Sequence, residues 1–203
     1  MKKALQNTIQ IAFLALFIIL IFKGKVQLWM GLFLLGIAAS LIMGRIFCGW
    51  ICPINTVIHT VTWIKKKLHI KTLRIPHFLI KPLVRFVALG LFITAFIFIM
   101  VSGNKLPVLP VLFALGILAT LFFPEELWHR YLCPFGKILS YTAANTRHTM
   151  MINPDKCYSC GVCFGVCPAK AVEKKESYHI IKGDCLVCME CARRCKQNAI
   201  MYK

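Results

Sequence analysis

Residues 157–168 read CYSCGVCFGVCP, and residues 185–196 read CLVCMECARRCK. Each run places four cysteines with two, two and three residues between them. This spacing supplies the thiolate ligands of a [4Fe-4S] cubane. Structural zinc sites are instead formed by two separated pairs of ligands. The C-terminal part of the chain is therefore predicted to hold two [4Fe-4S] clusters in a small α+β domain.

The two runs are expected to share their ligands. In folds with this doubled run, the fourth cysteine of each run ligates the cluster of the other run. Cluster 1 is then expected on Cys157, Cys160, Cys163 and Cys195. Cluster 2 is expected on Cys185, Cys188, Cys191 and Cys167. Gly161 gives the backbone room to approach the inorganic core, and Lys196 stands where a proline often follows the last cysteine.

The rest of the chain is apolar and basic. The 203 residues are 59% hydrophobic, with a mean hydropathy of +0.71. Four apolar runs, at 5–22, 26–43, 84–101 and 106–123, approach the ~20 residues that a transmembrane helix needs. We therefore expect an all-α membrane domain of four transmembrane helices over residues 1–145, followed by the ferredoxin-like α+β domain over residues 146–203.

The distribution of charge predicts the orientation of these spans. Residues 1–124 contain no Asp or Glu, and seven of their cations lie between the second and third spans: Arg45, Lys65, Lys66, Lys67, Lys71, Arg74 and Lys81. The positive-inside rule makes this loop and both termini cytoplasmic, in a protein of the cell inner (plasma) membrane. The cysteines then lie in a reducing compartment. Cations that border spans predict contact with anionic lipid, and they argue against nucleic acid as a partner.

The membrane part contains an internal repeat. A shift of 81 residues, from Cys52 to Cys133, aligns the first span with the third and the second with the fourth. It also aligns GRIFCGWICP (44–53) with EELWHRYLCP (125–134). Two copies of one helical hairpin are predicted. Each copy is followed by an amphipathic stretch, 54–68 and 135–144, suited to the headgroup layer of a bilayer.

The repeated motifs supply a candidate third metal centre from Cys48, Cys52, His129 and Cys133. The i, i+4 spacing at a helix end directs both side chains of a pair the same way. Three thiolates and one imidazole could bind a further iron-sulfur centre, or a copper or zinc ion. The alternative is a pair of packed cysteines with His129 between helices and no metal.

The complete arrangement resembles the polytopic iron-sulfur proteins of the NapH and NosR type, and the tail resembles bacterial two-[4Fe-4S] ferredoxins. The resemblance rests on CGWICP (48–53), on LCP (132–134) and on the eight tail cysteines. His129 departs from it, because the family's second motif has a cysteine there. The resemblance implies electron delivery to terminal reductases.

We therefore expect an electron-transfer subunit of an oxidoreductase complex rather than a complete enzyme. It would relay single electrons between a cytoplasmic or membrane donor and a quinone or partner redox subunit. Expected partners are the lipid bilayer, redox subunits, quinone, and soluble ferredoxin or flavodoxin. Residues Glu125, Glu126 and His129 could accept protons from a quinol on the cytoplasmic side. The alternatives are a membrane redox sensor or metal-handling accessory protein, and a pure anchor for a larger complex.

Overall fold

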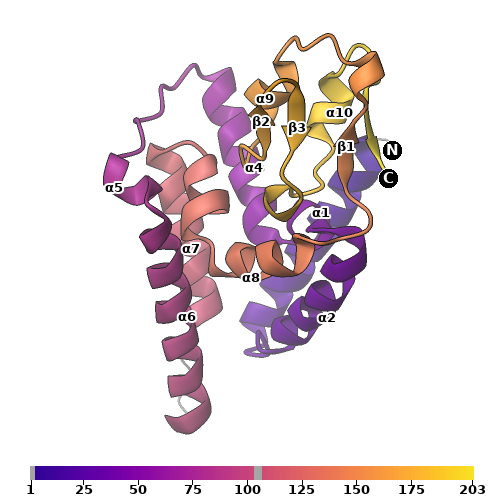
Figure 1. Cartoon of the computed structure of the whole chain (residues 1–203). Helices are drawn as coiled ribbons and strands as arrows, with labels where there is room; N and C mark the ends of the chain where they lie inside the picture. Colours follow the sequence, from indigo (N-terminus) through magenta and orange to yellow (C-terminus); the bar gives the residue numbers. More distant parts are fainter. Residues whose placement is uncertain (1–2, 103–106) are drawn as a thin grey trace. The chain divides into compact units, whose positions relative to one another are not determined.

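The computed structural model describes residues 3–102 and 107–203. Figure 1 labels its helices and strands. The chain divides into two compact units. The first contains Met1–Trp29 and Cys52–Lys137, and the second contains Met30–Ile51 and Ile138–Lys203. Each unit therefore combines segments that are far apart in the sequence.

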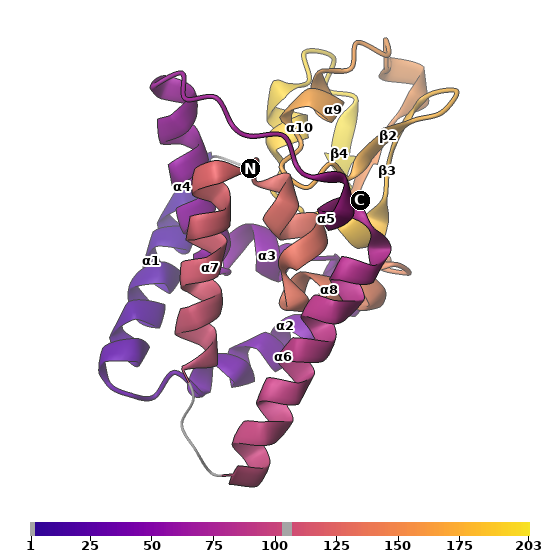
Figure 2. The ribbon, with the colours of Figure 1, turned by 90° about the vertical axis from the view of Figure 1, so that its left-hand side faces the viewer.

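The first unit is helical. Its elements are α1 (Lys3–Phe22), α4 (Pro53–Lys67), α5 (His77–Ile80), α6 (Pro82–Ser102), α7 (Val108–Phe122), the π-helix η1 (Leu127–Leu132) and the start of α8 (Pro134–Ala143). Helix α4 packs against both α1 and α7, and Figure 2 shows these three helices side by side. Helices α6 and α7 both contact the π-helix.

Helices α4 and α7 approach closely for an identifiable reason. A Cβ added to Gly116 of α7 would lie 2.8 Å from Ile54 and 3.1 Å from Trp128, so a side chain here would separate the helices. The buried Lys65 of α4 donates hydrogen bonds to the carbonyl oxygens of Thr120 (2.7 Å) and Leu121 (3.0 Å). This cation lies at the negative end of the α7 dipole and satisfies terminal carbonyls, which stabilises the pair.

Two of the four predicted spans, α1 and α6, are long and apolar enough to cross a membrane, by length and composition only. Helix α2 (Leu28–Met43, 16 residues) and α7 (15 residues) are shorter apolar helices. At 1.5 Å per residue they extend roughly 24 Å, less than the ~30 Å of a hydrocarbon core. The expected fourth span began at residue 106, which lies outside the described residues.

The two repeated motifs end in the same backbone conformation. Helix α3 (Ile46–Trp50) and the π-helix occupy corresponding positions, and α4 and α8 both begin at a proline. Cys52 has φ −63° and ψ 117°, and Cys133 has φ −73° and ψ 111°. A residue that precedes proline is disfavoured in the helical region. Pro53 and Pro134, the last residues of the two motifs, thus end the helix that precedes each of them.

The cysteine-rich tail is built from two copies of one pattern. Its elements are β1 (Met150–Ile152), η2 (Pro154–Lys156), α9 (Val162–Val166), β2 (Val172–Lys174), β3 (Tyr178–Ile180), η3 (Lys182–Asp184), α10 (Glu190–Arg194) and β4 (Ile200–Tyr202). The second four correspond to the first four at the offset that separates Cys157 from Cys185. The α+β character expected for the tail is confirmed.

The two copies exchange their strands. Strand β1 pairs antiparallel with β4, with Met151 opposite Met201. Strand β2 pairs antiparallel with β3, with Glu173 opposite His179. The first strand of each copy therefore pairs with the last strand of the other. Because β4 follows Cys195 and β1 precedes Cys157, this exchange brings the end of the second run beside the start of the first.

The second unit also includes α2 from Met30 onward, α3 and the end of α8. The backbone N–H of His148 donates to the carbonyl oxygen of Ile42 (2.9 Å), and that of Gly44 donates to Thr146 Oγ1 (2.9 Å). The Tyr202 hydroxyl donates to the carbonyl oxygen of Met43 (3.1 Å). The tail is thus hydrogen-bonded to the end of α2.

Candidate functional site

Two cavities in the second unit contain the tail cysteines. One, of about 530 Å³, is lined by Cys157, Cys160, Cys163 and Cys195. A smaller cavity is lined by Cys167, Cys185, Cys188 and Cys191, together with apolar side chains that include Met150 and Ile180. Each ligand set expected from the sequence therefore lines one cavity. Four thiols around a cavity form the donor set that a cubane requires.

Left-handed residues shape both cysteine loops. Ser159 (φ 54°) and Gly161 (φ 76°) flank Cys160, and Val187 (φ 52°) and Met189 (φ 60°) occupy the corresponding positions around Cys188. This conformation is unfavourable for a β-branched residue such as valine, and strained backbone of this kind concentrates at functional sites. The loops are thus held in a shape that the isolated chain would rarely adopt.

Backbone N–H groups also point toward the sulfur atoms of the smaller cavity. The N–H of Ala171 donates to Cys167 Sγ (3.3 Å). Backbone N–H groups of Val187 and Glu190 likewise bond Cys185 and Cys188. Hydrogen bonds to cluster sulfurs are one means by which a protein sets a reduction potential. The smaller cavity therefore contains donors suited to thiolate ligands.

Burial dominates the acidity of three thiols that line the smaller cavity. It raises the pKa of Cys185, raises that of Cys188 well above its usual range, and raises the pKa of Cys191 to about 12. Neighbouring thiols raise these pKa values further, and the backbone N–H donors lower them. Metal must therefore displace protons from these thiols when it binds.

Helix α3 packs directly on the loop between Cys185 and Cys188. A Cβ added to Gly49 would clash with the carbonyl oxygen of Leu186, so only glycine fits at this position. The Trp50 indole Nε1 donates to the carbonyl oxygen of Val187 (3.1 Å). Cys48 on the same helix is 7% exposed. The CGW segment of the first motif is therefore fixed against the second cysteine run.

The other three members of the candidate third centre belong to the first unit. Cys52 and Cys133 pack against the core formed by Ile54, Ile58 and Trp128. His129 is 5% exposed and lies on the π-helix. Among the described residues, no three His, Cys, Asp or Glu side chains are arranged to hold a single metal ion. A third centre stays a prediction.

The local geometry of the third-centre pairs differs from the sequence expectation. The i, i+4 spacing predicted both members of each pair on one helix end, but the backbone leaves the helical region at Cys52 and Cys133. The Cys133 N–H donates to the carbonyl oxygen of Trp128 (2.9 Å), five residues earlier, as in a π-helix. The following prolines explain the extended conformation, and π-turns are frequent at functional sites.

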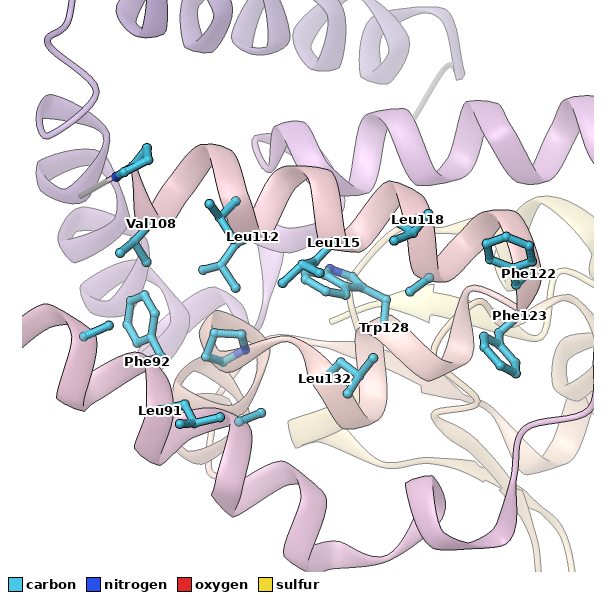
Figure 3. Close-up of a pocket in the computed structure, with 16 residues that line it drawn as sticks. Leu91, Phe92, Val108, Leu112, Leu115, Leu118, Phe122, Phe123, Trp128 and Leu132 are labelled. Carbon is cyan, nitrogen blue, oxygen red and sulfur yellow. The ribbon is translucent and has the colours of Figure 1, made fainter. Parts of the chain in front are cut away.

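A large apolar cavity lies in the first unit between α6 and α7 (Figure 3). Its volume is about 700 Å³. Leu91 and Phe92 line it from α6, Leu115 and Leu118 from α7, and Trp128 and Leu132 from the π-helix. The sequence did not predict this cavity, because apolar residues on a span equally suit contact with lipid.

Comparisons with known proteins agree with this geometry. A 4Fe-4S binding domain matches residues 26–71 and 106–143, which contain both repeated motifs (44–53 and 125–134), and a 4Fe-4S dicluster domain matches residues 131–171. The ferredoxin-type protein NapH of Haemophilus influenzae is 27% identical over 178 residues, which are 78% of this chain and 62% of NapH. The chain belongs to the ferredoxin-type proteins of the NapH and NosR type. It is an iron-sulfur electron-transfer protein.

Other relatives extend the comparison. An uncharacterized protein of Methanocaldococcus jannaschii is 29% identical over 83% of this chain and 68% of its own length. The methylamine utilization ferredoxin-type protein MauN of Paracoccus denitrificans is 26% identical over 76% of this chain and 61% of its own length. The chain thus spans about two thirds or less of these relatives. No solved structure matches it.

Proposed function

We propose that this chain is a membrane-bound relay that passes single electrons between a cytoplasmic or membrane donor and a quinone or partner redox subunit. Cys157, Cys160, Cys163 and Cys195 would hold cluster 1, and Cys185, Cys188, Cys191 and Cys167 would hold cluster 2. When bound, each cubane supplies one-electron exchange. Support comes from the two cavities, each lined by one of these sets.

The contact between α3 and the Cys185–Cys188 loop carries this proposal. Cluster 2 would lie on the side of the tail that contacts the CGW segment through Gly49 and Trp50. Cys160 in the cluster 1 loop is exposed, and Tyr158 beside it is 78% exposed. Cluster 1 would therefore exchange electrons with a soluble partner, and cluster 2 would face the first repeated motif (44–53).

Four spans with cytoplasmic termini remain the proposed topology. Large apolar side chains are exposed on all four apolar helices, among them Ile11 (64%), Leu35 (68%), Ile97 (55%) and Leu121 (49%). Exposed apolar surface on this scale marks contact with lipid or another protein. The agreement of element bounds across the 81-residue repeat supports two equivalent hairpins. The basic loop between them would lie on the cytoplasmic side.

The cavity of the first unit favours a quinone as the membrane-side partner. Its volume of about 700 Å³ falls within the usual range of small-molecule sites, and its lining is apolar. An isoprenoid tail requires such a lining. The π-helix that supplies Trp128 and Leu132 to the cavity also carries His129. A redox headgroup at that end would lie near the second membrane motif.

A cavity-filling variant tests the quinone assignment. Leu115→Trp adds bulk to the cavity, whereas Leu34→Trp places the same side chain at a site on α2 that is 63% exposed. We expect Leu115→Trp to slow reoxidation of the dithionite-reduced protein by a menaquinone analogue at least tenfold. The rate at which ferricyanide reoxidises Leu115→Trp should stay unchanged. Leu34→Trp should keep the wild-type rates with both oxidants. Equal quinone rates in both variants would exclude this cavity as the site.

Cys133→Ala tests the proposed third centre. If Cys48, Cys52, His129 and Cys133 hold metal, the variant should lose metal beyond the iron of the two tail clusters, and its electron flux to quinone should fall. EPR spectra and potentials of the tail clusters should remain those of the wild type. Unchanged metal content together with unchanged flux would show that these four residues hold no metal that electron transfer needs.

A further inference from the structure

Arg45 is a buried cation beside the second cysteine run. It immediately precedes α3, and only 1% of its surface is exposed. Its Nη1 donates to the carbonyl oxygens of Gly183 (3.3 Å) and Asp184 (3.5 Å), the two residues before Cys185. Its Nη2 donates to Cys48 Sγ (3.8 Å). The guanidinium therefore links the first repeated motif (44–53) to the residues that immediately precede Cys185.

These contacts do not neutralise the charge. Arginine stays protonated in proteins, so its charge cannot be removed by a shift in pKa. The partners of Nη1 and Nη2 are two carbonyl oxygens and a thiol, and the buried Nε has no hydrogen-bond partner among the described residues. Burial of a charge is unfavourable unless an opposite charge compensates it. The position therefore calls for a nearby anion.

We propose that Arg45 is the counter-ion of cluster 2 and raises the reduction potential of that cluster. This inference rests on the proposed ligand set Cys167, Cys185, Cys188 and Cys191. A cubane with four thiolate ligands has a net negative charge, which increases by one unit on reduction. A fixed cation nearby favours the reduced state, and burial limits screening by water and salt. Net charge is an established determinant of cluster potential.

The geometry supports Arg45 as this cation, because its guanidinium bonds the carbonyl oxygens of Gly183 and Asp184, next to Cys185. The other arginine near this loop, Arg193, donates to the Cys188 carbonyl oxygen (3.0 Å) but forms an ion pair with Glu190 at 2.7 Å. Arg193 thus already has an anionic partner within α10, Glu190, which also pairs with Arg194 at 3.5 Å. Arg45 acts on the potential through its position and touches no substrate, so it is a positioning residue.

The test compares charge-removing and charge-keeping variants in anaerobically purified full-length protein. Arg45→Met removes the cation, Arg45→Lys keeps it, and Lys175→Met removes a cation from an exposed site in the tail. Redox titration followed by EPR gives the midpoint potential of each cluster. Arg45→Met should lower the cluster 2 potential by at least 59 mV, a tenfold change in the reduced-to-oxidised ratio for one electron. The cluster 1 potential should stay unchanged in Arg45→Met. Both cluster potentials should stay unchanged in Arg45→Lys and in Lys175→Met.

Equal cluster 2 potentials in Arg45→Met and Arg45→Lys would overturn the inference. An equal shift of the two cluster potentials in Arg45→Met would also overturn it. If Arg45→Met assembles no cluster 2, the decisive measurement is pulsed EPR on protein labelled with ¹⁵N-arginine in an Arg193→Lys background. Nitrogen coupling to reduced cluster 2 supports the inference, and its absence overturns it. Failure of the proposed function is distinguishable from failure of this inference. In that case the wild-type protein itself would contain no iron-sulfur clusters.

Discussion

The indole Nε1 of Trp50 donates a 3.1 Å hydrogen bond to the carbonyl oxygen of Val187. Val187 lies between Cys185 and Cys188 and has a φ of 52°, a conformation that a β-branched residue rarely adopts. Trp50 itself is buried, at 6% exposure. A side chain from the first repeated motif (44–53) therefore helps to hold the strained loop that would carry two ligands of cluster 2.

Trp50→Phe should make cluster 2 labile. The substitution keeps an aromatic ring but leaves the Val187 carbonyl oxygen without its donor, at a cost of about 1–3 kcal/mol. We expect faster loss of the cluster 2 EPR signal when the oxidised protein is incubated with an iron chelator, while cluster 1 is unaffected. Trp63→Phe is the control, because Trp63 is 56% exposed. Identical rates in the two variants would contradict the role of Trp50.

Gly49→Ala should displace α3 from the cluster 2 loop. The new methyl group would clash with the Leu186 carbonyl oxygen, and overpacking against rigid backbone costs about 1–3 kcal/mol or more. We expect a changed cluster 2 EPR line shape and a lower melting temperature. Gly31→Ala is a matched control, because a Cβ at this α2 glycine meets no atom within 4 Å and alanine favours a helix. A normal cluster 2 signal in Gly49→Ala would refute close packing at this position.

Sequence patterns with local causes predicted much of this structure. The cysteine spacing indicated two equivalent loops, and the 81-residue register placed Pro53 and Pro134 at equivalent helix starts. Both patterns are local, since a proline or a left-handed residue fixes the backbone within a few positions. The α+β tail and the apolar helices α1 and α6 followed from the same kind of pattern.

Contacts between distant segments were not predictable. Arg45 reads as one more cation of a basic loop, and nothing near it in the sequence shows that it is buried against Gly183 and Asp184. Trp50 has the residue type of a membrane interface, yet it bonds Val187. The π-helix likewise has no residue signature beyond Pro134. These features depend on which segments meet in space, and hydrophobic periodicity does not encode that.

Exchange of the fourth cysteines should appear in the spectra of single-ligand variants. If the strand exchange places Cys195 with the first run, Cys195→Ala should lose the same EPR signal as Cys157→Ala. Cys167→Ala should lose the same signal as Cys185→Ala. EPR of the four dithionite-reduced proteins, with iron content measured in parallel, distinguishes these pairs. Grouping of Cys195→Ala with Cys185→Ala would show that each run holds its own cluster.

The metal-free protein should lose stability as pH rises above about 9. The pKa of Cys191 is raised to about 12 in the fold, whereas an unfolded thiol has a pKa of about 8.5. Between these values the unfolded chain has released a proton that the folded chain keeps, so the free energy of unfolding falls with increasing pH. The expected loss from this residue is roughly 2 kcal/mol at pH 10.5.

Denaturant unfolding of metal-free wild type at pH 8 and pH 10.5 measures this loss. Cys191→Ala should lose less stability over this interval. Alanine has no proton to titrate, so only the other buried thiols still contribute to the pH dependence. Equal losses in the two chains would mean that Cys191 does not keep its proton in the fold.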